Sequence, residues 1–271
     1  MKTRELQPAE NRLADAAAKF FKAQRDELIP RLREFEGTFP TQEALREAPS
    51  ESDMDRIWRA VEDATAGPLE DAIGQAASES MELGGASVAR DVGLQASFDV
   101  DNPAAVRYLE NLGARRVTGI NRETRRQLST LLSDAVEQGH SYQRTERAIR
   151  QRFDGMSARA PQAHIGSRAE LIAVTETAEA YGHSAALTAD DLAANGIETV
   201  KWWMTAGGDR VCQVCEPNGA QDGVPRGEPF ESGDYREPAH PACRCAVSYR
   251  PVRNAPDPAS VLPNLNTLIP A

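Results

Sequence analysis

The sequence has few aromatic residues and no long apolar segment. Aromatic residues make up 6% of the 271 residues, and the hydrophobic fraction is 40%. No stretch approaches the roughly 18–20 apolar residues that cross a bilayer. The N-terminal residues lack the apolar core of a secretory signal. We therefore expect neither a membrane protein nor an exported one, and the alanine-rich, aromatic-poor composition favours helices over sheets.

Positive charge is also scarce. The chain has 31 basic and 41 acidic residues, a formal net charge of −10, and residues 1–100 alone carry −8. Because binding to a polyanion needs clustered cations, this surface disfavours nonspecific contact with nucleic acid over most of its area. We interpret the densest group of cations as a solvated helix face and expect any contact with DNA to be local. That group is Arg115, Arg116, Arg122, Arg125 and Arg126.

Motifs of the common catalytic classes are absent from the sequence. There is no phosphate-binding loop, no Gly-x-Ser-x-Gly elbow and no His-Glu-x-x-His motif. His140, His164 and His183 have no partner at ligand spacing, so we interpret them as surface or capping residues. Glu176 and Glu179 could act as an acid–base pair, but a solvated helix face explains them better. We therefore expect that the protein is not an enzyme.

The first third of the chain shows helical periodicity. Residues 9–36 repeat apolar side chains at a spacing near 3.6 and predict a helix that Pro30 kinks or splits. Residues 53–65 predict a second helix that ends at Gly67-Pro68, and residues 69–96 predict a third. The small residues of this third helix let another backbone approach closely. We interpret them as an intramolecular contact, with a partner surface as the alternative.

The next helices have clearer boundaries. Asn121, Ser141 and Ser167 are expected N-caps, because each precedes an apolar repeat and can accept a hydrogen bond from the first turn. Gly139 and Gly196 stand where helices end.

The pattern changes after Gly196. Residues 200–204 and 246–249 predict two short strands, separated by a long loop rich in glycine and proline. We therefore predict an α+β protein, with a mostly helical N-terminal two thirds and a small C-terminal β subdomain. The predicted segments are a helical region over 1–100, a second helical part over 101–197, a Cys/His β subdomain over 198–250 and an extended, proline-rich tail over 251–271.

All four cysteines lie in the loop between the two predicted strands. Cys212 and Cys215 form a Cys-x2-Cys pair, which presents two thiols to one point. His240, Cys243 and Cys245 follow at the far end of the loop and add three more candidate ligands. A tetrahedral metal ion takes four ligands, so one of the five is spare. The spacing does not say which of His240, Cys243 and Cys245 it is.

Two other interpretations of the cysteines compete with a metal site. The thiols could form two disulfides, but we expect no export signal, and the cytosol keeps thiols reduced. They could also be inert core thiols, but such residues have no need to cluster in a loop that has little core of its own. A structural zinc ion fits best, because thiolate-rich zinc sites are closed whereas catalytic zinc keeps an open position. Binding would contribute directly to folding of the subdomain.

Five groups of residues, taken in order, resemble a known family. They are Arg168-Ala-Glu-Leu-Ile-Ala-Val-Thr-Glu176-Thr-Ala, Lys201-Trp-Trp-Met-Thr-Ala, Asp209-Arg-Val-Cys212-x-x-Cys215 with Gly219, Pro229-Phe230, and His240-Pro-Ala-Cys243-Arg-Cys245. Together they are similar to the phage head morphogenesis family of minor head proteins, which includes the F protein of phage Mu and gene product 7 of phage SPP1. The resemblance covers about residues 105–250, and the closing His-Pro-x-Cys-Arg-Cys signature is its most specific part.

The resemblance implies a component of a tailed-phage or prophage virion, made in the host bacterial cytoplasm and placed inside the capsid. Such proteins are present in few copies, associate with the portal protein, and act in head assembly or at DNA exit. The family is not known as a catalytic one, and we expect none of the C-terminal toxin domains that some relatives carry. Many relatives lack the full Cys-x2-Cys pair, so zinc is inferred from the spacing in this chain. The alternatives are a zinc-containing nucleic-acid-binding module or nuclease, and a phage-derived effector toxin.

Overall fold

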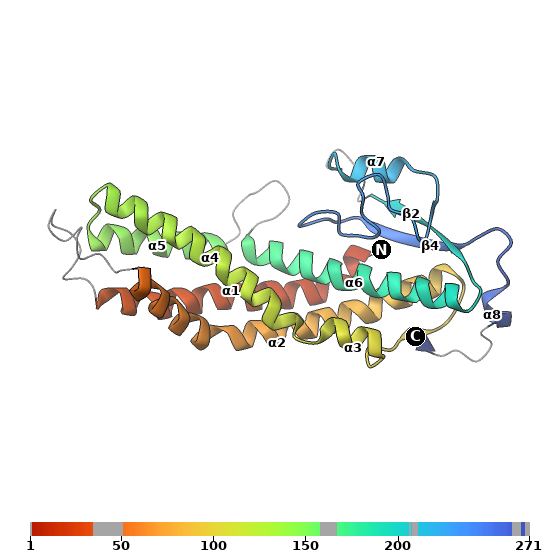
Figure 1. Ribbon diagram of the computed structural model, residues 1–271, viewed down its shortest axis with the longest axis horizontal. Helices are drawn as coiled ribbons and strands as arrows, with labels where there is room; N and C mark the ends of the chain where they lie inside the picture. Colours follow the sequence, from red (N-terminus) through yellow and green to blue (C-terminus); the bar gives the residue numbers. More distant parts are fainter. Residues whose placement is uncertain are drawn as a thin grey trace. The chain divides into compact units, whose positions relative to one another are not determined.

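The computed structural model describes residues 2–34, 51–157, 167–205, 207, 211–261 and 267–268 (Figure 1). Helices make up most of these residues, and three short strands form one antiparallel sheet near the C-terminal end. The α+β prediction is therefore confirmed. The longer helices are α1 (Lys2–Arg33), α2 (Glu51–Asp91), α4 (Leu112–Glu137), α5 (Tyr142–Ser157) and α6 (Arg168–Ala194). The shorter ones are α3 (Pro103–Leu109), α7 (Cys215–Ala220) and α8 (Pro258–Val261).

The chain packs as two compact units. One, here called the sheet unit, contains Met1–Arg12, Gly74–Glu110 and Leu171–Ala271; the other, the helical unit, contains Leu13–Ile73 and Asn111–Glu170. Helices α1 and α2 contribute residues to both units. These units group residues by packing and combine segments that are distant in sequence, so the predicted division into four consecutive segments stays a prediction.

The sheet consists of three antiparallel strands. β2 (Thr199–Met204) lies between β3 (Val224–Pro225) and β4 (Ala246–Pro251), with Lys201 opposite Tyr249 on one side and Val224 on the other. The strands predicted over 200–204 and 246–249 are thus confirmed, while β3 and α7 were not predicted. A separate parallel pair joins β1 (Ser97–Phe98) to β5 (Thr267–Leu268). α8 and β5 lie in the tail that was expected to be extended throughout.

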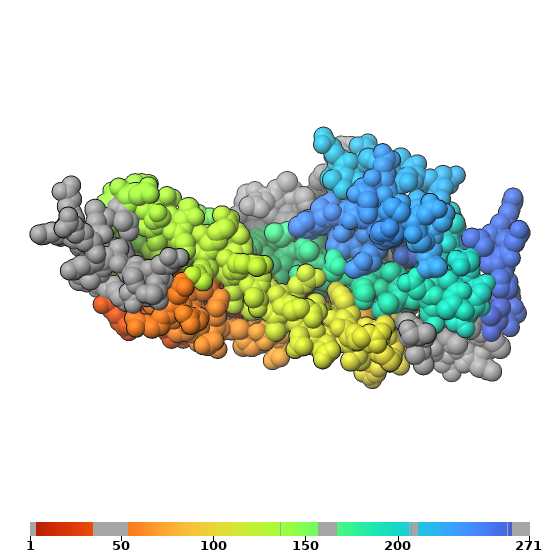
Figure 2. Space-filling model, in the orientation of Figure 1, coloured from red at the N-terminus to blue at the C-terminus, as the bar shows by residue number. Residues whose placement is uncertain are grey.

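The core of the sheet unit lies between the sheet, α2 and α6. Along β2 the side chains alternate, with Trp203 3% exposed and Trp202 half-buried, as strand geometry requires. Trp203 packs edge-on against Phe230, with ring centroids 5.0 Å apart. Val88, Ala89 and Val92 of α2, together with Ala185, Ala189 and Leu192 of α6, belong to the same cluster of buried side chains. Figure 2 shows the sheet and its loops as a rounded lobe above α6.

The predicted break at Gly67-Pro68 is wrong. Helix α2 continues through Pro68 without a change of phase, since Val61, Leu69 and Ile73 are all buried on one face. A proline inside a helix removes one backbone hydrogen bond. Burial of this continuous apolar face outweighs that local cost, because tertiary packing overrides intrinsic propensity. Helix α1 likewise runs through Pro30 to Arg33 and begins at Lys2, seven residues before the predicted start.

Two of the three predicted N-caps are confirmed. Ser141 accepts a hydrogen bond from the Arg144 amide, and Ser167 accepts one from the Glu170 amide. Asn121 is not a cap, because α4 begins at Leu112 and places Asn121 inside the helix, where its side chain accepts a hydrogen bond of 2.7 Å from buried Gln24. The error arose because asparagine is a common N-cap, and the sequence does not distinguish a capping asparagine from a buried one with a tertiary partner.

The small residues of α2 allow close packing within the sheet unit. At Gly84, an added Cβ would overlap the Tyr181 carbonyl and the Ser184 hydroxyl of α6, and at Gly85 it would overlap the Phe98 ring. The intramolecular interpretation of this stretch is therefore supported at both positions.

Substitution of Gly84 by alanine tests this close approach. We expect Gly84→Ala to lower the free energy of unfolding by about 1–3 kcal/mol, because the added methyl group has to push α2 away from α6. Gly74→Ala is the matched control in the same helix, since nothing lies within 4 Å of its added Cβ. The control is expected to stabilise by about 0.5–1 kcal/mol. Equal effects of the two changes in urea denaturation would contradict the proposed contact.

Candidate metal centre

Two turns of the same kind bring the candidate ligands together. In the first, the Cys215 amide donates to the Cys212 carbonyl at 3.0 Å, and α7 begins at Cys215. In the second, the Cys243 amide donates to the His240 carbonyl at 3.1 Å. Each turn places residues i and i+3 on one side of the chain. The first turn precedes α7 and the second precedes β4, so the sheet unit holds both in place.

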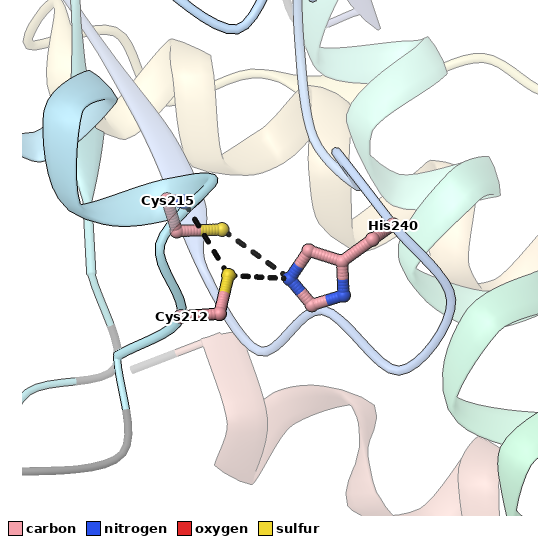
Figure 3. Close-up of side chains that lie close together, drawn as sticks. All are labelled: Cys212, Cys215 and His240. Atoms are coloured by element: carbon pink, nitrogen blue, oxygen red, sulfur yellow. Dashed lines mark hydrogen bonds between the residues drawn. The ribbon is translucent and has the colours of Figure 1, made fainter.

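The imidazole of His240 points at the thiols of the first turn (Figure 3). Its Nε2 lies 3.1 Å from Cys212 Sγ and 3.4 Å from Cys215 Sγ. Its Nδ1 lies 2.8 Å from the Pro241 carbonyl oxygen. Because a carbonyl oxygen only accepts hydrogen bonds, Nδ1 carries a proton, and in the neutral ring Nε2 then presents its lone pair. A second hydrogen bond that fixes the tautomer is typical of metal-binding histidines.

The remaining two cysteines complete the cluster. Cys215 Sγ lies 3.7 Å from Cys243 Sγ, and the ligand atoms of Cys215, Cys243 and Cys245 all lie within 4.8 Å of one another. Cys212, Cys215 and His240 form a second group within the same limit, so Cys215 belongs to both. The structure therefore brings together all five residues predicted from the sequence. The four cysteines form no disulfide, and the cluster could hold a metal ion.

The pKa values of the two central thiols, Cys215 and Cys243, are raised. The pKa of Cys215 rises to about 12, chiefly because burial penalises the thiolate and secondly because of the nearby Cys243. The pKa of Cys243 is raised as well, first by its hydrogen bond with Cys245 and then by burial. Without a cation these thiols stay protonated at neutral pH. A metal ion that binds here has to displace their protons, so its affinity falls as the pH is lowered.

Helix α6 holds the second turn in position. Thr175 Oγ1 accepts a hydrogen bond of 3.0 Å from the Ala242 amide, inside the His240–Cys243 turn. Four residues later on the same helix, Glu179 accepts a hydrogen bond of 3.0 Å from Arg236. The Thr-Glu-Thr-Ala-Glu segment thus supports residues 236–245, here called the metal loop. Sequence reasoning missed this role. The available signal in the sequence was Thr175, a side chain that can accept a hydrogen bond, directly before Glu176.

Arg244 fixes the metal loop to the N-terminal helix. It lies between Cys243 and Cys245, and its guanidinium donates to both carboxylate oxygens of Glu10 at 2.7 and 2.6 Å. The Glu10 side chain is only 6% exposed, whereas the Arg244 side chain is 25% exposed. Sequence reasoning missed this pair, because the two residues are separated by more than two hundred positions.

Lys201 anchors the long loop between β3 and β4. Its side chain is 1% exposed, and Nζ donates to the Tyr235 carbonyl at 2.7 Å. The ammonium also lies 4.8 Å from the centroid of the Phe230 ring and 5.4 Å from that of Tyr235. Burial lowers the pKa of Lys201 to about 8. The aromatic contacts and the hydrogen bond compensate part of the cost of burying the charge.

Lys201 makes a pH-dependent contribution to stability that can be measured. Its pKa lies near 8 when folded and near 10.4 in an unfolded chain. Between these values the unfolded state binds more protons, so this lysine contributes increasing stability as the pH rises from about 8. In matched urea titrations at pH 7 and 9, we expect the free energy of unfolding of Lys201→Met to rise less than that of the unchanged protein, by about 1 kcal/mol. Parallel profiles would contradict a lowered pKa of Lys201 in the folded protein.

The other candidate residues lie away from the cluster or have structural partners. His183 stacks on Tyr108 with centroids 4.1 Å apart, and burial lowers its pKa to about 4. His164 lies outside the described residues. In the arginine-rich segment of α4, Arg125 pairs with Asp55 and Arg126 pairs with Glu123. These ion pairs fit the interpretation of a solvated helix face.

The described part of the chain is thus an α+β protein whose small antiparallel sheet carries a Cys/His cluster that could hold a metal ion. Residues 126–248 match the family described as phage Mu protein F like protein. This match supports the phage head morphogenesis family, and the resemblance found in the sequence is confirmed over these residues. No curated protein and no solved structure gave a match. Among the described helices, none is long and apolar enough to span a membrane.

Proposed function

We propose that the protein is a minor head protein with a structural role in assembly of a phage head. The family match over 126–248 is the observation that carries this proposal, since it points to phage head morphogenesis and to capsid-related partners. From the family we further propose association with the portal protein, a place in the capsid interior, and contact with the packaged DNA.

The proposed role of the Cys/His cluster is to bind a structural zinc ion. The donors are sulfur and imidazole nitrogen, which suit zinc, and Cys215, Cys243 and Cys245 are all buried. A buried, thiolate-rich site leaves no open position for a substrate or an activated water. We therefore propose that the protein is not an enzyme, and that the ion joins the two turns to form a rigid lobe.

A zinc-containing nucleic-acid-binding module is the second candidate function. An open groove of about 520 Å³ along α4 and α5 is lined by Arg126, Arg152 and His140, which favours a polyanion. However, Asp134 lines the same groove and Glu123 neutralises Arg126. Residues 198–253, around the metal site, carry 7 basic and 8 acidic residues. The observed charges therefore favour a head protein whose contact with DNA is local.

Copurification with the portal protein tests the proposed function. We expect the portal protein encoded beside this gene to retain the chain at moderate salt, and particles assembled with it to contain a few copies by quantitative mass spectrometry. The proposal would be overturned if normal heads assemble in the absence of the gene and particles assembled in its presence contain no copies of the chain. A gel-shift titration at 50 and 200 mM salt separates the alternative. Tight binding of DNA by the purified protein at both concentrations would favour the nucleic-acid module.

A further inference from the structure

We propose that the metal ligands are Cys212, Cys215, His240 and Cys243, and that Cys245 is the spare residue. This assignment rests on the metal site proposed above and specifies its coordination. The candidates follow a single structural rule, because each of the two i, i+3 turns supplies its first and last residue. Cys212 and Cys215 end one turn, while His240 and Cys243 end the other.

Hydrogen bonding within the turns supports the same four residues. The Cys215 amide donates not only to the Cys212 carbonyl but also to Cys212 Sγ, at 3.3 Å. An amide directed at sulfur stabilises a thiolate, because it supplies a positive dipole to the developing charge. On the opposite turn, the hydrogen bond from Nδ1 to Pro241 leaves Nε2 of His240 directed at both thiols. Both turns are therefore organised around their ligand atoms.

Three of the six distances between the proposed ligand atoms lie close to the edges of a tetrahedron. Zinc–sulfur bonds of about 2.3 Å and zinc–nitrogen bonds of about 2.0–2.1 Å give edges of roughly 3.8 Å between sulfurs and 3.6 Å between sulfur and nitrogen. The Sγ atoms of Cys215 and Cys243 are 3.7 Å apart, and Nε2 of His240 lies 3.1 Å from Cys212 Sγ and 3.4 Å from Cys215 Sγ. Cys243 does not share a 4.8 Å group with Cys212 and His240, so the two turns have to move closer together when an ion binds.

Cys245 follows the pattern of the strand instead. It lies directly before β4, and the buried residues Cys245, Val247 and Tyr249 alternate with the more exposed Ala246 and Ser248. Its side chain thus begins the buried face of β4, although it shares the core cluster of Trp203 with Cys215 and Cys243 and lies within 4.8 Å of both thiols. Three thiolates and a neutral imidazole around a divalent ion carry a net charge of −1. Four thiolates would carry −2, which costs more to bury, so the charge disfavours His240 as the spare residue.

Metal content and cobalt spectra of three variants test this assignment. We expect Cys245→Ala to bind one equivalent of zinc, and its cobalt form to keep the sulfur-to-cobalt absorption of the unchanged protein. Cys243→Ala and His240→Ala are expected to lower metal affinity by at least tenfold. Since some variants could misfold, a variant that gains a ligand provides an independent measurement. In a Cys245→Ala background, His240→Cys should increase the sulfur-to-cobalt absorption by about one third, because three thiolates become four.

The outcomes separate this assignment from the zinc proposal. Loss of metal from Cys245→Ala, or unchanged metal binding by His240→Ala, would overturn the assignment while leaving a metal site in place. If the unchanged protein binds no metal when it is purified under reducing conditions, the zinc proposal and the assignment are both overturned.

Discussion

Chelation of the metal is expected to destabilise the sheet unit more than any single side-chain change outside the cluster. Its long loop has little core of its own, and metal binding contributes directly to folding in such subdomains. We expect a strong chelator to lower the free energy of unfolding by at least about 3 kcal/mol, a conservative fraction of the roughly 10–16 kcal/mol of zinc-finger peptides. Trp203, which is 3% exposed, should report this through a red shift of its fluorescence.

Two variants make this result specific to the cluster. Cys215→Ser removes the residue shared by both groups of ligands, so the variant should be as unstable as the chelated protein and should not respond further to the chelator. Cys245→Ala serves as the matched thiol control, because we assign it no contact with the ion. A chelator that leaves the stability and fluorescence of the unchanged protein as they were would contradict a structural metal.

Loss of Arg244 is the second change with a large expected effect. Arg244→Met leaves the carboxylate of Glu10 buried without its cationic partner, and removal of one member of a buried ion pair costs about 3 kcal/mol. Thermal or urea denaturation measures the loss. Arg12→Met is the matched control, because Arg12 pairs with Glu79 at an exposed position, with the two side chains 56% and 35% exposed. We expect the control to cost less than about 1 kcal/mol.

A double-mutant cycle separates the ion pair from packing. Glu10→Gln removes the buried charge, so Arg244→Met should cost at least about 1 kcal/mol less in that background than in the unchanged protein. Additive effects would show that Arg244 acts through packing of its aliphatic stem and that the pair carries no coupling. The metal content of each variant, measured in parallel, shows whether the N-terminal helix also stabilises the metal loop.

Local signals in the sequence predicted the elements whose cause is local. Ser141 and Ser167 cap helices because a hydroxyl reaches an amide three residues away, with no contribution from the rest of the chain. The short β-prone run of residues 200–204 predicted β2 in the same way. At Pro68 the local signal failed, since burial of the α2 face extends over many turns and outweighs the proline.

At the candidate site too, the sequence predicted the features with a local cause and missed those that depend on tertiary contacts. Spacing alone identified all five candidate ligands, because a Cys-x2-Cys turn converges on one point whatever surrounds it. Spacing could not choose the spare ligand, since that choice depends on the phase of β4 and on the tautomer of His240. It also could not reveal that Thr175 and Glu10 support the loop, because those contacts form only when α6 and α1 pack beside it.

The amino-acid sequence alone thus determined the helical character, the two strands, the family resemblance and the set of sulfur and nitrogen donors, all of which depend on residue type and short-range spacing. Only the tertiary structure decided which helices continue through proline, which buried charge pairs with Arg244, and which turns face each other across the cluster. Those features depend on contacts between residues that are far apart in the chain, and their energies arise from burial, which no local pattern records.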